Sequence, residues 1–163
     1  QDKTRPEQVS IGIAAEHGGV KLKEFLVKRL SDANYEVIDF GDSELKNVDD
    51  YPDFVIPLAD AIANGTVDRG IAVCGSGVGA CIAVNKIAGV RGCLITEKFS
   101  AKQGVEDDNM NVICFGGRVI TESLAGELLN IFLKAKFSGA ERTVRRLAKV
   151  ETLEKQPNKK SIQ

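Results

Sequence analysis

The 163-residue sequence has no tryptophan, one histidine and two tyrosines, so it offers few aromatic rings on which nucleic-acid bases could stack. It has no excess of positive charge, because 22 basic residues face 23 acidic ones and the formal net charge is −1. General attraction to nucleic acid or to an anionic membrane is therefore not expected. No apolar run approaches the roughly 18 residues of a membrane-spanning helix, and the start QDKTRPEQ lacks the apolar core of a secretory signal.

The cysteines do not form a metal-binding pattern. Cys74, Cys81, Cys93 and Cys114 contain no C-x-x-C pair, and only one histidine is available to complete a Cys/His zinc site. Three of the four stand in apolar runs, where cysteine is often a small buried hydrophobe. We therefore expect a reduced, cytoplasmic protein without a bound metal.

Strands and helices alternate along the chain. Short apolar segments predict strands over 9–15, 35–40, 69–74, 90–95 and 111–116. Helices are predicted over 20–33, 52–64, 122–137 and 140–154, and two more end near residues 86 and 106. Nearly all-apolar strands predict a parallel sheet buried on both faces, hence an α/β fold of the three-layer αβα sandwich type with five parallel strands. We expect a single domain over 9–154, with flexible termini at 1–8 and 155–163.

Two details of this prediction stay open at the level of the residues. Residues 41–50 are polar and loop-like, and Pro57 should either kink the second helix or delay its start. The strand order is not readable directly, since flavodoxin-like and Rossmann-like orders both place a crevice beyond the carboxyl ends of the strands. Unusual residues follow the first strand (AAEHGG) and the third (CGSGVG), which favours the order 2-1-3-4-5, in which these loops are neighbours.

The glycine loop after the third strand suits a small anion. Gly75, Gly77 and Gly79 leave backbone amides uncovered at the start of a predicted helix, which is an anion-binding arrangement. The loop lacks the G-K-[ST] of a phosphate-binding P-loop, and its third glycine arrives one residue early for G-x-G-x-x-G. A small anion or a developing oxyanion is therefore favoured over a nucleotide cofactor.

Cys74 and His17 are the candidate reactive groups. Cys74 precedes the glycine loop, where a helix N-terminus favours a thiolate, and a thiolate beside oxyanion donors can remove a proton next to a carbonyl. The alternative is a core residue at a strand end. His17, flanked by Glu16, could polarise a sugar hydroxyl or carbonyl or help to open a sugar ring, the alternative being a capping residue.

Arginines near the end of the chain are candidates for binding phosphate. Arg142 and Arg146 are four residues apart on a predicted helix and so share one face, and two guanidinium groups together suit a phosphate. A solvated basic face is the alternative, since Arg145 lies close by. Arg118, just after the fifth strand, is a further candidate.

Five segments, AAEHGG, VDDYPDF, CGSGVGACIAVNK, NVICFGGRVI and FSGAERTVRR, occur together in this order. Through them the chain, over residues 9–154, resembles the type B ribose-5-phosphate isomerases and the galactose-6-phosphate isomerase subunits. The resemblance implies an αβα sandwich that forms a homodimer or a dimer of dimers, with active sites at the subunit interface. It also implies that no metal or cofactor is needed, because backbone amides stabilise the enediolate.

The resemblance further implies roles for single residues. Cys74 is similar to the base that moves a proton between the two carbons of an enediolate, and Ser76 stands where the family has a threonine that contacts substrate hydroxyls. The implied anion hole and substrate contacts are Gly75, Gly77, Gly79, His17, Tyr51, Arg118, Arg142 and Arg146, some of the arginines reaching the site of a partner subunit.

Three departures from the family pattern bear on the substrate. Glu16 replaces an aspartate, and Thr143 stands where many members have a histidine. In EDDNMNV (106–112), Asp107 and Asp108 stand in place of a His-Asn pair whose histidine helps to open the furanose ring. A carboxylate can take the proton of the anomeric hydroxyl, but it donates one poorly at neutral pH and repels an anionic substrate.

Several functions therefore remain as alternatives. In the favoured one, Asp107 or His17 opens the ring and the enzyme interconverts ribose 5-phosphate and ribulose 5-phosphate in the pentose phosphate pathway. A tetrulose 4-phosphate, which cannot form a furanose, or a hexose 6-phosphate could replace that substrate, or the protein could bind sugar phosphates without catalysis. A redox or thiol-sensing protein would need a flavin or a resolving cysteine, and Cys81 lies two helical turns, ~10 Å, beyond Cys74.

Overall fold

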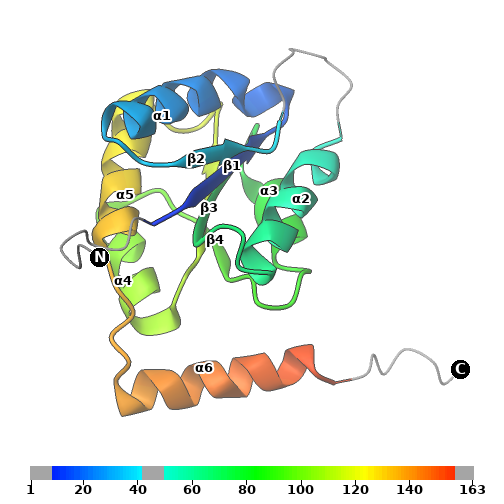
Figure 1. Cartoon of the computed structure of the whole chain (residues 1–163), viewed down its shortest axis with the longest axis vertical. Coiled ribbons are helices and arrows are strands. Elements are labelled where there is room, and N and C mark those ends of the chain that lie inside the picture. Colours follow the sequence, from blue (N-terminus) through cyan, green and yellow to red (C-terminus); the bar gives the residue numbers. More distant parts are fainter. Residues whose placement is uncertain (1–8, 42–49, 157–163) are drawn as a thin grey trace, which may run out of the picture.

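The computed structural model describes residues 9–41 and 50–156 (Figure 1). Within these ranges one parallel sheet contains β1 (Ile11–Ala15), β2 (Val37–Asp39), β3 (Arg69–Cys74), β4 (Gly92–Leu94) and β5 (Val112–Gly116). The helices are η1 (His17–Gly19), α1 (Val20–Asp32), α2 (Pro52–Ala63), α3 (Val78–Val84), α4 (Lys98–Asp108), α5 (Glu122–Lys134) and α6 (Glu141–Glu154). The predicted five-stranded αβα sandwich is confirmed, whereas the loop predicted over 41–50 lies almost wholly outside the described residues.

The two faces of the sheet are covered by different helices. In β3, Ile71 and Val73 point into a core shared with α1, α4 and α5, while Ala72 and Cys74 point into a second core beneath α2 and α3. This alternation follows from the period of two along a strand, and burial on both faces explains why the strand sequence is continuously apolar.

The favoured strand order is wrong at its last two positions. The sheet runs β2-β1-β3-β5-β4, so β5, not β4, lies beside β3. Every residue of β5 is buried, whereas the three-residue β4 leaves Cys93 and Leu94 exposed. A fully apolar strand gains more from a central position, and a short, half-exposed strand is suited to an edge. The predicted neighbourhood of the loops after β1 and β3 is confirmed, since these strands pair in register.

Helix boundaries differ from the predicted ones in ways that have local causes. Helix α2 begins at Pro52 and runs through Pro57, so the alternative of a delayed start is wrong. Helix α5 ends at Lys134, three residues before the predicted end, where the half-buried Arg69 guanidinium donates to the carbonyls of Phe132 and Ala135. That guanidinium also lies 5.1 Å from the centre of the Phe132 ring. Burial lowers the pKa of Arg69 from its ordinary value.

Helix α6 lies apart from the sandwich, below the amino edge of the sheet (Figure 1). Thr143 is its one buried residue, and its hydroxyl donates to the carbonyl of Ala140 at 2.8 Å. At the other end of the helix, the carboxylate of Glu154 accepts from the amide of Gly89 at 3.1 and 3.2 Å. None of the helices in the described ranges has the length and apolar character that a membrane crossing requires.

Candidate functional site

Three loops meet at the carboxyl edge of the sheet, beyond β1, β3 and β5. The amide of Gly117 donates to the carbonyl of Cys74 at 2.8 Å, and the amide of Arg118 donates to the carbonyl of Gly75 at 3.0 Å. The amide of Glu16 donates to the carbonyl of Val73 at 3.2 Å and so ties the first loop to β3. The three loops are thus joined by backbone hydrogen bonds into one surface.

Glycines allow these backbones to approach closely. A Cβ on Gly116 would lie 2.5 Å from the carbonyl oxygen of Ser76, and one on Gly18 would lie 3.1 Å from the backbone nitrogen of Gly75. A Cβ on Gly117 would collide with the carbonyl oxygen of Gly18. Our sequence interpretation missed Gly18, Gly116 and Gly117, although the paired glycines that follow β1 and β5 were the available signal.

Cys74 lies where these loops meet and is 5% exposed. The amide of Gly77 donates to its Sγ at 3.1 Å. Gly77 has φ +81°, and a side chain there would also meet the backbone of Phe115, so this donor position requires glycine. The first intrahelical bond of α3 joins the amide of Cys81 to the carbonyl of Gly77, which leaves the preceding amides of the first turn without intrahelical partners.

His17 and Glu16 form a contact beside this loop. Nδ1 of His17 lies 2.8 Å from Oε2 of Glu16, without the geometry of a hydrogen bond. The other oxygen of Glu16, which is 7% exposed, accepts from the amide of Gly18 at 2.9 Å. The Glu16 carboxylate therefore stabilises the turn after β1 and contacts the imidazole of His17.

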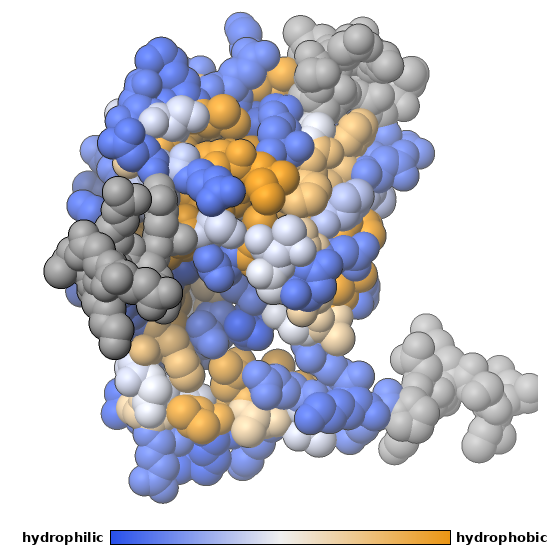
Figure 2. All heavy atoms as spheres, viewed as in Figure 1, coloured by the Kyte–Doolittle hydropathy of each residue, from blue (hydrophilic) through white to orange (hydrophobic). Residues whose placement is uncertain are grey.

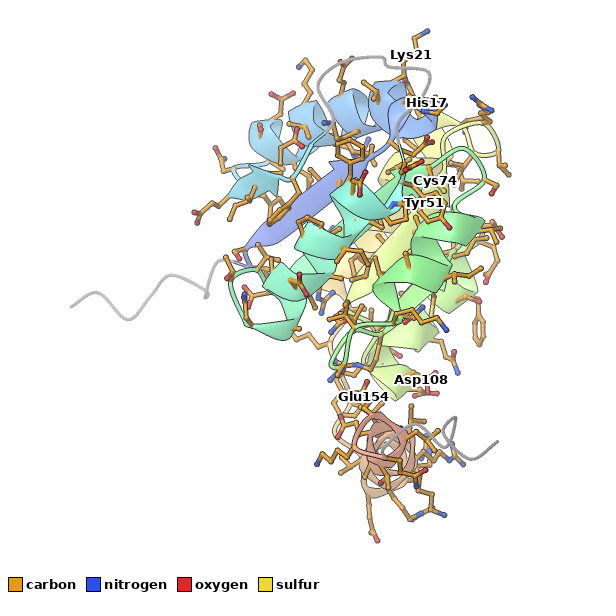
Figure 3. All side chains as sticks on the ribbon, turned by 90° about the vertical axis from the view of Figure 1, so that its right-hand side faces the viewer. His17, Lys21, Tyr51, Cys74, Asp108 and Glu154 are labelled. Carbon is orange, nitrogen blue, oxygen red and sulfur yellow. The ribbon has the colours of Figure 1, made fainter. Side chains whose placement is uncertain are left out.

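The remaining predicted residues of this edge surround the glycine loop. Figure 3 shows Tyr51, Cys74 and His17 gathered at one end of the molecule. The ring of Tyr51 covers Gly79, since a Cβ there would lie 2.7 Å from its Cζ. The Arg118 guanidinium lies beside Gly75, 3.8 Å from a Cβ built there. Ser76 is exposed, and its hydroxyl accepts from the amide of Val78 at 3.3 Å.

The other four predicted site residues lie at the opposite edge. Figure 3 shows Asp108 far below Cys74, because helices between parallel strands return in the opposite direction and α4 therefore ends at the amino edge. Asp107, beside Asp108, accepts from Nε2 of Gln103 at 3.0 Å. Arg142 and Arg146 are exposed on α6, below the same edge. One chain therefore does not bring these four residues to Cys74.

A cavity of about 510 Å³ separates α6 from the sandwich and is visible as a hollow in Figure 2. Its apolar lining includes Val90, Met110 and Leu147. Along α6, Val144, Val150 and Leu153 are 49%, 55% and 66% exposed. The helix thus carries apolar side chains that one chain does not cover.

Asn85 has a structural role that the sequence did not reveal. Its side-chain amide donates to the carbonyl of Gly92 at 2.8 Å, and its side-chain oxygen accepts from the amide of Gly92 at 2.8 Å. This two-way pairing fixes the end of α3 against the first residue of β4 and explains the asparagine before the final lysine of the motif CGSGVGACIAVNK. In the part of the chain that the structure describes, no three His, Cys, Asp or Glu side chains converge as a metal site.

A family model described as Ribose/Galactose Isomerase matches residues 11–150. A crystal structure of ribose-5-phosphate isomerase B from Mycoplasma genitalium with bound ribulose-5-phosphate superposes with a TM-score of 0.86 at 37% identity. That similarity covers 91% of this chain and 98% of the other.

Two curated relatives carry different substrate names. Ribose-5-phosphate isomerase B of Escherichia coli is 36% identical over 148 residues, covering 91% of this chain and 98% of the relative. D-erythrulose-4-phosphate isomerase of Pectobacterium atrosepticum is 35% identical over 131 residues, covering 80% of this chain and 86% of the relative.

Proposed function

This chain belongs to the ribose/galactose isomerase family, and from that premise we propose that it interconverts ribose 5-phosphate and ribulose 5-phosphate through an enediolate. The observation that carries the proposal is the environment of Cys74: a sulfur that accepts an amide hydrogen bond at 3.1 Å, at the junction of three loops. A reaction that moves one proton between neighbouring carbons needs a base and donors for the developing oxyanion, and the Cys74 sulfur and the amides of the glycine loop are suited to these roles.

In the proposed reaction the Cys74 thiolate removes the proton from C2 of the open-chain aldose. The electron pair of that bond forms the C1–C2 double bond, and negative charge develops on O1, where amides of the glycine loop donate to it. The resulting thiol returns the proton to C1 while the O2 proton moves to O1, which yields the ketose. The Cys74 side chain is 5% exposed, and this low-polarity setting strengthens the amide hydrogen bonds to the developing charge.

We propose that the complete site forms between two copies of the chain. Asp107, Arg142 and Arg146 lie at the edge opposite to Cys74, so within one chain they cannot contact the same small substrate. A two-fold symmetric dimer can place α6 of one copy against the carboxyl edge of the other, and it does so twice. The exposed apolar residues of α6, among them Leu153 at 66% exposure, support burial against a partner.

A tetrulose 4-phosphate is the second candidate substrate. Asp107 stands where the resemblance places a ring-opening histidine, and its carboxylate is held by the side chain of Gln103 at 3.0 Å. A substrate that cannot form a furanose needs no ring-opening group. The similarity to a D-erythrulose-4-phosphate isomerase supports the same alternative.

Solvent exchange tests the chemical role of Cys74. In deuterated water, the wild type is expected to exchange the C2 proton of the substrate, and Cys74→Ala is expected to slow both exchange and isomerisation by at least about 100-fold. Cys93→Ser, a change at an exposed thiol of β4, is the matched control and should exchange normally. Exchange at the wild-type rate by a folded Cys74→Ala protein would remove the thiol from the mechanism.

A panel of tetrose, pentose and hexose phosphates distinguishes the substrates. If ribose 5-phosphate is the substrate, its kcat/KM should exceed that of erythrulose 4-phosphate in the wild type. The reverse order would favour the tetrulose phosphate, and Asp107→His should then improve turnover of ribose 5-phosphate.

A further inference from the structure

Three of the four cysteines cluster at the face of the sheet that α3 covers, two of them on strands and one on α3 itself. Cys74 and Cys114 point from neighbouring strands into the core that α2 and α3 cover, and Cys81 packs against that core from α3. Cys114 is fully buried, whereas Cys81 is partly exposed. The proposed mechanism uses only the first of these thiols, so Cys81 and Cys114 remain without an assigned function.

The side chains of Cys81 and Cys114 lie in the same core, where an interaction between their sulfur atoms shifts the two pKa values in opposite directions. Geometric contacts place the Cys81 sulfur against the edge of the sheet: its Sγ lies 3.7 Å from the carbonyl oxygen of Gly92 and accepts from Nδ2 of Asn85 at 3.6 Å, and Leu94 lies two residues along the same strand. Leu94 is the register partner of Cys114 in the sheet. A disulfide requires the two sulfur atoms to approach to roughly 2.05 Å, and both side chains already lie in one packed core beside the paired strands β4 and β5.

The surroundings favour a thiolate at Cys81 over one at Cys93. The hydrogen bond from Cys114 lowers the pKa of Cys81 to about 6, helped by the backbone of Leu94 and by Asn85, and opposed by burial. Burial and the nearby Cys81 raise the pKa of Cys93, although that side chain is more exposed. The same bond to Cys81, together with burial, raises the pKa of Cys114 well above its ordinary value. Hydroperoxides oxidise thiolates, so Cys81 is the thiol that combines ionisation with access.

We propose that Cys81 and Cys114 are a redox-active pair in which a hydroperoxide oxidises Cys81 and Cys114 then closes a reversible intramolecular disulfide. In the first step the Cys81 thiolate attacks the peroxide oxygen, the O–O bond breaks, and a sulfenic acid and hydroxide form. In the second step the Cys114 sulfur attacks the Cys81 sulfur, the S–O bond breaks, and water leaves with the thiol proton. Two thiols and one hydrogen peroxide thus become one disulfide and two waters, and an external dithiol reverses the reaction.

The pair is one helical turn from the loop that surrounds Cys74. The amide of Cys81 donates to the carbonyl of Gly77 at 3.0 Å, and its own carbonyl accepts from the Asn85 side chain at 2.9 Å. Closing the bond shifts α3 against β5 at the helix end that carries the glycine loop. The modification site itself is independent of the proposed isomerase activity and is detected without any sugar phosphate.

Peptide mapping of the full chain after brief treatment with hydrogen peroxide tests the proposal. The expected product is a linked pair of peptides containing Cys81 and Cys114, lighter by two hydrogen atoms than the free peptides and fully separated by dithiothreitol. The Cys93→Ser control should form the same link to the same extent, because Cys93 takes no part. A link from Cys81 to Cys93, links only between chains, or no link at all would each overturn the proposal.

A second variant keeps the test decisive. Cys114→Ala removes the resolving thiol, so its Cys81 should accumulate as a sulfenic acid that dimedone traps, while the wild type gives little adduct because the disulfide forms first. If Cys114→Ala does not fold, the wild-type link and its reversal by dithiothreitol remain the deciding measurement. Equal dimedone labelling of Cys81 in a folded Cys114→Ala protein and in the wild type would contradict a resolving role for Cys114.

Discussion

The carboxyl edge of the sheet and helix α6 hold the two halves of the candidate site in opposite ways. At the edge, Cys74 is 5% exposed and backbone hydrogen bonds join three loops around it. On α6, Arg142 and Arg146 are exposed, and Thr143 is the one residue of that helix buried against the rest of the chain. One half is rigid within a single chain, and the other is presented outward.

The proposed reaction gives each of these two regions a different task. Proton transfer and oxyanion stabilisation require donors held to within fractions of an ångström, which a closely packed backbone provides. Phosphate recognition needs charge and bidentate donors, which exposed arginines can carry to a partner. Substitutions at the carboxyl edge should therefore lower the free energy of unfolding, whereas substitutions of the arginines on α6 should weaken substrate binding.

The largest expected effect comes from the arginines of α6. The double variant Arg142→Ala/Arg146→Ala should raise KM by roughly 10²- to 10⁴-fold, because it loses two charge-assisted hydrogen bonds to phosphate that are worth about 1.5–3 kcal/mol each. Its melting temperature should match the wild type, since both side chains are exposed. Arg145→Ala, on the same helix, is the control and should leave KM within about two-fold. If Arg145→Ala raised KM as much as the double variant does, the effect would come from the overall positive charge of α6 and not from specific contacts of Arg142 and Arg146.

A smaller effect, on stability, is expected at the edge. Gly116→Ala places a Cβ 2.5 Å from the carbonyl oxygen of Ser76, a backbone atom that cannot rotate away, and should lower the free energy of unfolding by about 2–3 kcal/mol. Gly104→Ala, within α4, meets only the flexible end of Met110 at 3.3 Å and should be neutral or stabilising by up to about 1 kcal/mol. Urea denaturation of both variants measures the difference. Equal stability would show that the loops are not closely packed.

The smallest expected effect concerns the attachment of α6. Glu154→Ala removes the carboxylate that accepts from the amide of Gly89, an exposed contact worth about 1 kcal/mol or less. Hydrogen exchange at the Gly89 amide should accelerate while the amides of β3 stay protected. Glu151→Ala, elsewhere on the same helix, should leave that exchange rate as it is. An unchanged rate at Gly89 in Glu154→Ala would mean that α6 is not held there.

The sequence predicted what depends on local pattern. The five strands, the glycine loop and the closeness of His17 to Cys74 follow from apolar runs and from residues at strand ends, which need no long-range information. The order of β4 and β5 was not predicted. It depends on whether the three-residue β4 or the fully buried, five-residue β5 takes the central position beside β3. Strand spacing along a chain does not record that competition.

The residue pattern also did not reveal that the candidate residues lie at two opposite edges of the sheet. Asp107 and Arg142 were picked out by their positions in the sequence. The direction of α4 and the position of α6 outside the sandwich decide which edge they occupy. Only the family resemblance suggested that arginines reach a partner. Gly18 and Gly116 were missed because their role is to let backbones touch, and that becomes apparent only when the loops are assembled.

The most direct test of a site shared between copies is complementation between two inactive proteins. In a homodimer of Cys74→Ala, or in one of Arg142→Ala/Arg146→Ala, both active sites lack a required side chain and are inactive. Co-expressed, the two variants should regain about a quarter of the wild-type activity, because half of the dimers are hybrids and each hybrid keeps one intact site. If all these residues instead served a site within one chain, every chain would carry a damaged site. The mixture would then be no more active than the two variants assayed separately.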